Sequence, residues 1–247
     1  MQQSQLTSYL NQLLQVSNFN DYCPNGLQVT GVTEINKIIT GVTACQALLD
    51  VAVKKQADTI LVHHGYFWRG EDPCITNIKR QRIATLLAHN LNLFAYHLPL
   101  DAHALYGNNA QLGLRLGIKV KAIHDNGLFY VGVLPQSLTA TQLQQHLARV
   151  LHRQPQYISG NDEKISTIAW CTGAGQDFIE KAKLYGVDAY ISGEISERTF
   201  HLARELGIHY FAAGHHATER YGVQALGAHL AGKYNLTVEF VDIKNPV

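Results

Sequence analysis

The sequence predicts an α/β protein built from two similar lobes, each with a mostly parallel sheet. Short apolar segments alternate with helical segments of roughly 10 to 15 residues, which is typical of parallel strands joined by crossover helices. This order of segments occurs twice along the chain. A length of 247 residues with 46% hydrophobic content allows each lobe a core of its own.

The first half begins with an amphipathic helix, followed by a loop rich in turn-forming residues, DYCPNG. The apolar runs KIITGVT and DTILVHH then read as buried strands. The expected elements are a helix at 5–16, a loop at 21–26, strands at 37–43, 58–64 and 91–97, and helices at 45–56, 77–89 and 109–116.

The second half repeats the alternation after a strand and a helix that begins at a Thr cap. The expected strands are 128–134, 167–172, 188–192, 209–213 and 236–241, and the expected helices are 139–152, 177–185, 196–205 and 218–233. We therefore predict a first lobe at 1–122 and a second at 123–247, with the C-terminal segment 236–247 free to pack back on the first lobe.

Two coincidences of spacing suggest that the lobes are related. Thr43 and Asp58 are as far apart as Gly173 and Asp188, which aligns the pair His63-His64 with Gly193-Glu194. After the third strand of each half comes a histidine followed four residues later by an acid. These pairs are His97 with Asp101 and His215 with Glu219. The alternative is two unrelated α/β lobes that share only a generic pattern.

Composition narrows the class of protein. Twenty Lys and Arg against nineteen Asp and Glu give a net charge of +1, which disfavours nucleic acid or an anionic membrane as a partner. No secretory pattern or membrane-length apolar run is present, so a cytoplasmic location is expected. The four cysteines form no CxxC pair and are expected to be reduced and mostly structural.

The sequence contains thirteen histidines, and four of them form two adjacent pairs. This pattern directs attention to metal binding. His63 and His64 end a predicted strand, at the edge where a parallel sheet binds ligands. Pro99 can present Asp101 toward the same edge, and His215 and Glu219 share a helix face at i and i+4. Imidazole and carboxylate together suit zinc, manganese or iron.

Other readings of these residues stay open. Taken alone, Asp101 is more typical of a helix cap or Asx turn, and the His215-Glu219 pair of a surface contact. The segment Gly173-Ala-Gly175 could offer amides to an anion, although a plain tight turn is preferred. The aromatic run after His64, residues 66–68, could stack on a base, but packing of its loop is the commoner role.

Six short motifs, taken together, resemble the YbgI-like, or NIF-three-like, family, whose members are often labelled GTP cyclohydrolase I type 2 homologues. The motifs are NGLQV at 25–29, LVHHG at 61–65, HLPLDAH at 97–103, NNAQL at 108–112, SGE at 192–194 and AGHHATER at 213–220. The resemblance covers essentially the whole chain. It implies two similar lobes, a dinuclear metal centre in the cleft between them, and a toroidal homohexamer.

The resemblance also implies roles for individual residues. The metal ligands fall on the five positions that spacing selected, namely His63, His64, Asp101, His215 and Glu219. Glu219 would bridge the ions, with His64 and Asp101 serving one, and His63 and His215 the other. Positions His97 and Glu194 match residues near the centre that support the ligands or transfer protons, and we take them as candidate catalytic groups.

Three functions remain compatible with these expectations. The preferred one is a hydrolase in which two divalent ions activate a water against a nucleotide or related small molecule. An open site of three histidines and two carboxylates favours this, since structural zinc sites are usually closed and rich in Cys. The alternatives are a non-catalytic, metal-binding hexamer that binds or assembles partners, and a nucleic-acid-related phosphoesterase linked to the DNA damage response.

Overall fold

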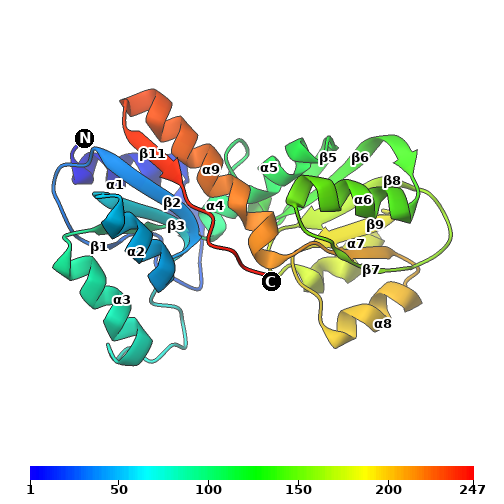
Figure 1. Cartoon of the computed structure of the whole chain (residues 1–247). Helices are drawn as coiled ribbons and strands as arrows, with labels where there is room; N and C mark the ends of the chain where they lie inside the picture. The colour runs from blue at the N-terminus through cyan, green and yellow to red at the C-terminus, as the bar shows by residue number, and fades with distance from the viewer. The chain divides into compact units, whose positions relative to one another are not determined.

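The computed structural model describes residues 1–247, which form two compact units (Figure 1). The first unit comprises Met1–Leu100 and Gly222–Lys244, and the second comprises Asp101–Tyr221 and Asn245–Val247. The predicted boundary after residue 122 differs from this division. The reason is packing, because Leu112, Leu116 and Ile118 belong to the hydrophobic core of the second unit.

The first unit contains a five-stranded sheet in the order β1-β4-β3-β2-β11. Four strands run parallel, and the edge strand β1 is antiparallel to β4. The C-terminal strand β11 pairs with β2. The strands are β1 (Gly26–Val29), β2 (Lys37–Thr43), β3 (Thr59–His64), β4 (Asn92–Ala95) and β11 (Thr237–Phe240). Only β1 was not expected, since GLQV is too short and polar to stand out as a strand.

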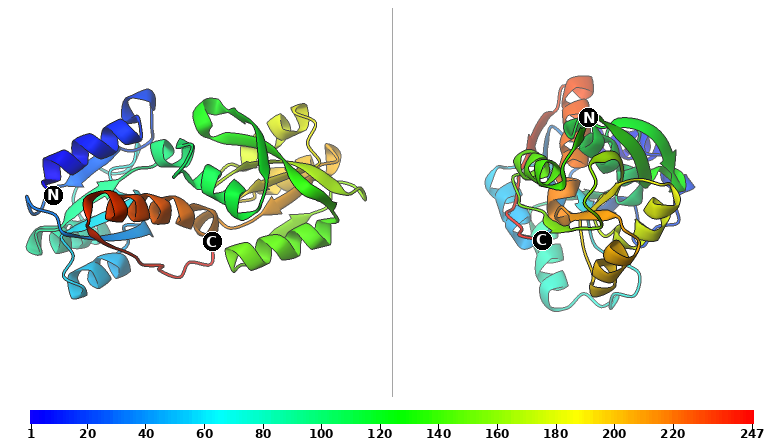
Figure 2. Two further views of the ribbon diagram at one scale, coloured as in Figure 1. Left: turned by 90° about the horizontal axis from the view of Figure 1, so that it is seen from above. Right: turned by 90° about the vertical axis from the view of Figure 1, so that its right-hand side faces the viewer.

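Helices cover both faces of this sheet. The apolar side chains of α2 and α3 pack with Ile39, Ile60 and Leu93 of the strands. In the left view of Figure 2, α1 lies on the side of the strands opposite α2 and α3. The helical elements are α1 (Gln3–Leu13), η1 (Val16–Asn18), α2 (Gln46–Lys54), α3 (Asn77–Ala88), α4 (Leu98–Ala102, at the boundary of the units) and the last part of α9 (His215–Tyr234).

The second unit contains a six-stranded sheet in the order β5-β6-β8-β9-β10-β7. Its three central strands, β8, β9 and β10, are parallel, whereas β5, β6 and β7 pair antiparallel. The sheet is therefore mixed. The strands are β5 (Lys119–His124), β6 (Phe129–Leu138), β7 (Gln156–Ile158), β8 (Ile165–Cys171), β9 (Ala189–Ser192) and β10 (His209–Ala212). Neither β5 nor β7 was expected from the sequence, because both carry mainly polar or exposed residues.

Two cores form on the two faces of this second sheet. Trp170, Ile191 and Phe211 pack against helices α5, α6 and the start of α9 on one face, while Tyr190 and Tyr210 pack against α7 and α8 on the other. The predicted Thr cap is confirmed, since the hydroxyl of Thr139 accepts from the amide of Gln142. The helical elements are α5 (Asn108–Arg115), η2 (Asp125–Gly127), α6 (Ala140–Leu151), η3 (Gln176–Phe178), α7 (Ile179–Leu184) and α8 (Glu197–Glu205).

The two units share a common plan. Across the first sheet the strand order is β1-β4-β3-β2, and it corresponds to β7-β10-β9-β8 across the second sheet. In both sheets the antiparallel strand lies at the corresponding edge. The two units also share a set of hydrogen bonds from backbone amides to an aspartate. The carboxylate of Asp58 accepts from the backbone amides of Asn36 and Lys37, and that of Asp188 accepts from those of Ser166 and Thr167. Such a specific repeat favours two related lobes over two unrelated ones.

No helix of the structure is both long and apolar enough to cross a membrane. All four cysteines are free, with Cys23 and Cys171 buried. Burial and the negative charges of Asp101 and Glu219 raise the pKa of the Cys171 thiol, so this cysteine is protonated and unreactive at neutral pH.

Candidate metal centre

The first unit gathers three histidines at the carboxyl end of its parallel strands. His63 and His64 end β3, and His97 follows β4. Their ring centroids lie 4.5 Å apart for His63 and His64, and 5.1 Å apart for His63 and His97. Nitrogens of the three rings lie within 4.8 Å of one another, which is close enough to hold a metal ion. The end of β3 therefore brings the rings of both His63 and His64 to one place.

The tautomer of His63 suits a metal ligand. Its Nδ1 lies 2.9 Å from the backbone carbonyl of Tyr96, which can only accept, so Nδ1 carries the proton. The lone pair of the neutral ring is then on Nε2, as ligation requires. The side chain is fully buried. A neighbouring contact places the hydroxyl of Thr43 at 3.3 Å from Nδ1 of His64.

In the second unit, Asp101 is a buried carboxylate that neighbouring side chains orient. The amide of Asn108 donates to its Oδ1 at 2.8 Å, and the hydroxyl of Thr172 donates to the same oxygen at 3.3 Å. Asn109 is also fixed, since its side chain accepts from the amide of Thr172. Asn108 and Asn109, which begin α5, therefore support Asp101. The position of these asparagines in the sequence, after the HLPLDAH motif, did not reveal this role.

His215 and Glu219 lie on the first turns of α9, which begins at His215, three residues earlier than predicted. Nε2 of His215 lies 3.1 Å from Oε2 of Glu219, and its Nδ1 lies 2.6 Å from Oε1 of Glu194. Burial lowers the pKa of His215, but hydrogen bonds and charge from Glu219 and Glu194 outweigh it and raise the pKa to about 9. The neighbour His216 belongs to none of the candidate metal-binding groups.

The charge balance of the second unit fits a divalent cation. Asp101 is 6% exposed and Glu219 is 3% exposed, and ligand oxygens of the two lie within 4.8 Å of each other. Two buried carboxylates at this separation repel each other, and each has lost most of its hydration. A cation between them removes both penalties. The donor set of imidazole and carboxylate matches zinc, manganese or iron rather than calcium or magnesium.

Gly173 also belongs to this centre, although the sequence singled it out only as part of a turn. It has a φ of +63°, and a Cβ at this position would lie 2.1 Å from Oε1 of Glu219 and 3.2 Å from Nε2 of His215. Its backbone amide donates to the hydroxyl of Thr218. The amide of Gly173 is therefore engaged within the protein, and the glycine itself has a further role, since only glycine leaves room for the carboxylate.

The aromatic run after His64 divides between two roles. Tyr66 is buried, and its hydroxyl donates to the carbonyl of Ala44, so it packs its own loop. Trp68 lies against the histidines, with its ring centroid 5.0 Å from that of His97 and 5.9 Å from that of His64. The candidate centre of the first unit is therefore lined by an indole ring as well as by imidazoles.

Together these features define a two-unit α/β protein in which histidines and buried carboxylates gather at the carboxyl ends of the parallel strands. The family whose model matches residues 1–246 is described as Duf34/NIF3 (NGG1p interacting factor 3). The chain belongs to this family. The resemblance predicted from the six sequence motifs is thereby confirmed.

Relatives cover the full length of the chain. A protein of Vibrio cholerae serotype O1 called "GTP cyclohydrolase 1 type 2 homolog" is 52% identical over 252 residues and covers all of both chains. Among solved structures, the protein ybgI, described as of unknown function, has a TM-score of 0.97 at 48% identity over the whole of both chains. A protein of Thermus thermophilus has a TM-score of 0.92 at 32% identity, again over the whole of both chains.

Proposed function

We propose that this chain is a hydrolase that depends on two divalent metal ions and acts on a nucleotide or related small molecule. The observation that carries the proposal is the buried acid pair Asp101 and Glu219, which lies beside His215 at the carboxyl ends of parallel strands. The name of the Vibrio cholerae relative supports the substrate class, because it is that of a GTP cyclohydrolase homologue.

In this proposal, the ligands are the five residues that the family resemblance implies, namely His63, His64, Asp101, His215 and Glu219. The carboxylate of Glu219 lies near both His215 and Asp101, so Glu219 would be the ligand that the two ions share. When bound, two divalent ions would lower the pKa of a water molecule and polarise the group that this water attacks. Zinc, manganese and iron are the candidates.

Two further residues would support this chemistry. Glu194 accepts from Nδ1 of His215, so it holds the imidazole in the orientation in which Nε2 faces Glu219. We therefore assign to Glu194 the task of orienting a ligand, rather than direct contact with the substrate. His97 is placed beside His63 and His64 without being needed to complete the set of five ligands, and we assign to it the transfer of a proton.

The experiment that tests the function combines metal analysis with a substrate screen. The purified chain is analysed by mass spectrometry for metals, stripped with a chelator, and reloaded separately with zinc, manganese or iron. GTP and other nucleotides are then incubated with each form, and the products are separated by chromatography. We expect about two ions per chain and turnover that requires reloading. Two bound ions without turnover of any nucleotide or related small molecule would contradict the hydrolase proposal.

That negative outcome would favour the second candidate, a metal-binding protein that assembles with partners and catalyses nothing. The observation in its favour is the family description, which names an interacting factor. Cleavage of a nucleic acid in the same screen would instead favour the phosphoesterase. The near-neutral net charge of +1 makes this outcome the least expected.

We also propose that the chain forms a toroidal homohexamer in the cytoplasm, as the family resemblance implies. Analytical ultracentrifugation at micromolar concentration tests the assembly. A single species with six times the mass of the 27.4 kDa chain is the expected result. A stable monomer under the same conditions would contradict the proposal of a closed ring.

A further inference from the structure

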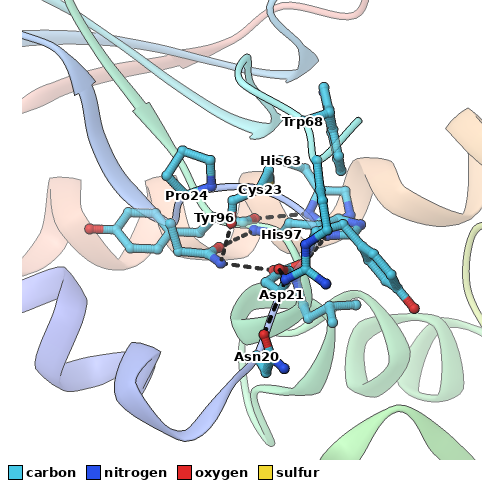
Figure 3. Close-up of polar contacts among 12 residues, drawn as sticks. Asn20, Asp21, Cys23, Pro24, His63, Trp68, Tyr96 and His97 are labelled. Atoms are coloured by element: carbon cyan, nitrogen blue, oxygen red, sulfur yellow. Dashed lines mark hydrogen bonds and ion pairs between the residues drawn. The ribbon is translucent and has the colours of Figure 1, made fainter. Parts of the chain in front are cut away.

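The loop before β1 holds a buried carboxylate that the sequence did not single out. The side chain of Asp21 is 2% exposed, and four donors surround it (Figure 3). Oδ1 accepts from the amide of Tyr22 at 2.6 Å and from Nδ1 of His97 at 2.7 Å. Oδ2 accepts from the side-chain amide of Asn25 at 2.8 Å and from the amide of Leu98 at 3.0 Å.

This surrounding keeps Asp21 ionised. Burial raises the pKa of its carboxyl group, but the hydrogen bond and charge of His97 and the donors Asn25 and Tyr22 outweigh burial and lower the pKa to about 2. An ionised carboxylate can only accept hydrogen bonds. Nδ1 of His97 must therefore carry a proton, and the lone pair of the neutral ring is on Nε2.

The backbone of His97 is fixed as well as its ring. Its amide donates to Oδ1 of Asn25 at 2.7 Å, so the same loop holds both ends of the residue. Figure 3 shows the ring between Asp21 on one side and His63 and Trp68 on the other. With Nδ1 engaged by Asp21, Nε2 is the nitrogen that His97 presents to a ligand or water beside the other two histidines.

The second unit repeats the arrangement. His215 follows the third parallel strand of its sheet as His97 follows the third of its own, and each has Nδ1 on a carboxylate. The carboxylates come from different places, Asp21 from the loop before β1 and Glu194 from the loop after β9. The same pairing thus arises from two different loops, and in each unit it holds Nδ1 of the histidine on a carboxylate.

We propose that Asp21 is a positioning residue, which fixes His97 as the Nδ1–H tautomer so that Nε2 can accept the proton of the attacking water. The inference rests on the proposed hydrolase function. In this step an O–H bond of the water breaks, an N–H bond forms at Nε2, and the oxygen keeps the electron pair and bonds to the substrate. The imidazolium is paired with Asp21, whose Oδ1 lies 2.7 Å from Nδ1 of His97 in the structure. The bond between the substrate and its leaving group then breaks, and the proton on Nε2 passes to the leaving group.

The tautomer is tested on the metal-free protein, without any substrate. Solid-state NMR of sedimented protein with 15N-labelled histidine distinguishes protonated from unprotonated ring nitrogens, and His97→Gln assigns the signal by removing it. We expect His97 to show a protonated Nδ1, and Asp21→Ala to shift the proton toward Nε2. A wild-type ring protonated on Nε2, or an unchanged signal in Asp21→Ala, would overturn the assignment of Asp21.

The catalytic arm compares three variants loaded with the metal that gives activity. We expect Asp21→Ala to lower kcat about 10- to 100-fold with little change in KM and in metal content. Asp21→Asn keeps the shape and an oxygen that can accept from Nδ1, so its loss should be smaller. Asn20→Ala is the control, because Asn20 contacts Arg69 and not His97.

The outcomes separate this inference from the proposed function. An Asp21→Ala protein that keeps full kcat, or that loses metal well beyond the Asn20→Ala control, would show that Asp21 does not act through His97. If no substrate is found at all, the hydrolase proposal fails, whereas the NMR measurement still decides whether Asp21 sets the tautomer of His97. Should the alanine variant fail to fold, the spectrum of the wild-type protein still tests the tautomer, and the asparagine variant still tests the smaller loss of kcat.

Discussion

Replacing Glu219 by glutamine will release more metal than any other conservative change of a single proposed ligand. Glu219 is 3% exposed and lies near both His215 and Asp101 within the second unit, so its charge acts on the whole proposed centre. Glutamine keeps the size but removes the negative charge that offsets the repulsion between two dications. Changes in groups that only support a ligand cost 10- to 100-fold in affinity, and we expect a loss of roughly 100-fold or more here.

The matched control is His216→Gln, on the same helix. Adjacent residues on an α-helix point about 100° apart, and His216 belongs to no candidate metal-binding group. Metal content per chain after dialysis is measured for both variants, with folding checked by circular dichroism. If Glu219→Gln keeps both ions, or His216→Gln loses them, then the ligand assignment on α9 is wrong.

Much of the fold was predictable because the strands that form its centre are apolar. Strand β2 was placed with its observed bounds, and every expected parallel strand is present. The strands that were missed all lie at sheet edges, and β5 contains no buried residue. Periodicity detects a run of buried residues, and each of these strands has at most two. The boundary between the two units depends on the packing of Leu112 and Leu116 in the second core. A local sequence pattern does not show which core a residue joins.

The residues of the candidate site also differ in how far the sequence predicts them. Its histidines and acids were found because they are chemically unusual and stand at strand ends in repeated spacing. Their supporting residues were not found, since Asp21 and Asn108 are ordinary loop and helix-start residues in the sequence. Asp21 is separated from His97 by 76 positions, and only the fold brings the two within 2.7 Å. A motif can therefore indicate the ligands, whereas the groups that orient them follow from tertiary structure.

Replacing Gly173 by alanine will weaken metal binding far more than it weakens folding. The new Cβ would lie 2.1 Å from Oε1 of Glu219, so one of the two must move. The end of a glutamate side chain moves more easily than a backbone, and the carboxylate will leave its place near His215. We expect a 10- to 100-fold loss of metal affinity, comparable to the loss of an orienting group.

A second glycine variant separates the backbone strain of Gly173→Ala from its contact with Glu219. Gly173 has a φ of +63°, where alanine costs about 1 to 2 kcal/mol in stability. Gly186 has a φ of +66° in the same unit, and nothing lies within 4 Å of the position of its missing Cβ. Gly186→Ala should therefore lose about the same stability in thermal unfolding but keep its metal in equilibrium dialysis. Equal metal loss in the two variants would mean that strain alone explains the effect, and that Gly173 makes no room for Glu219.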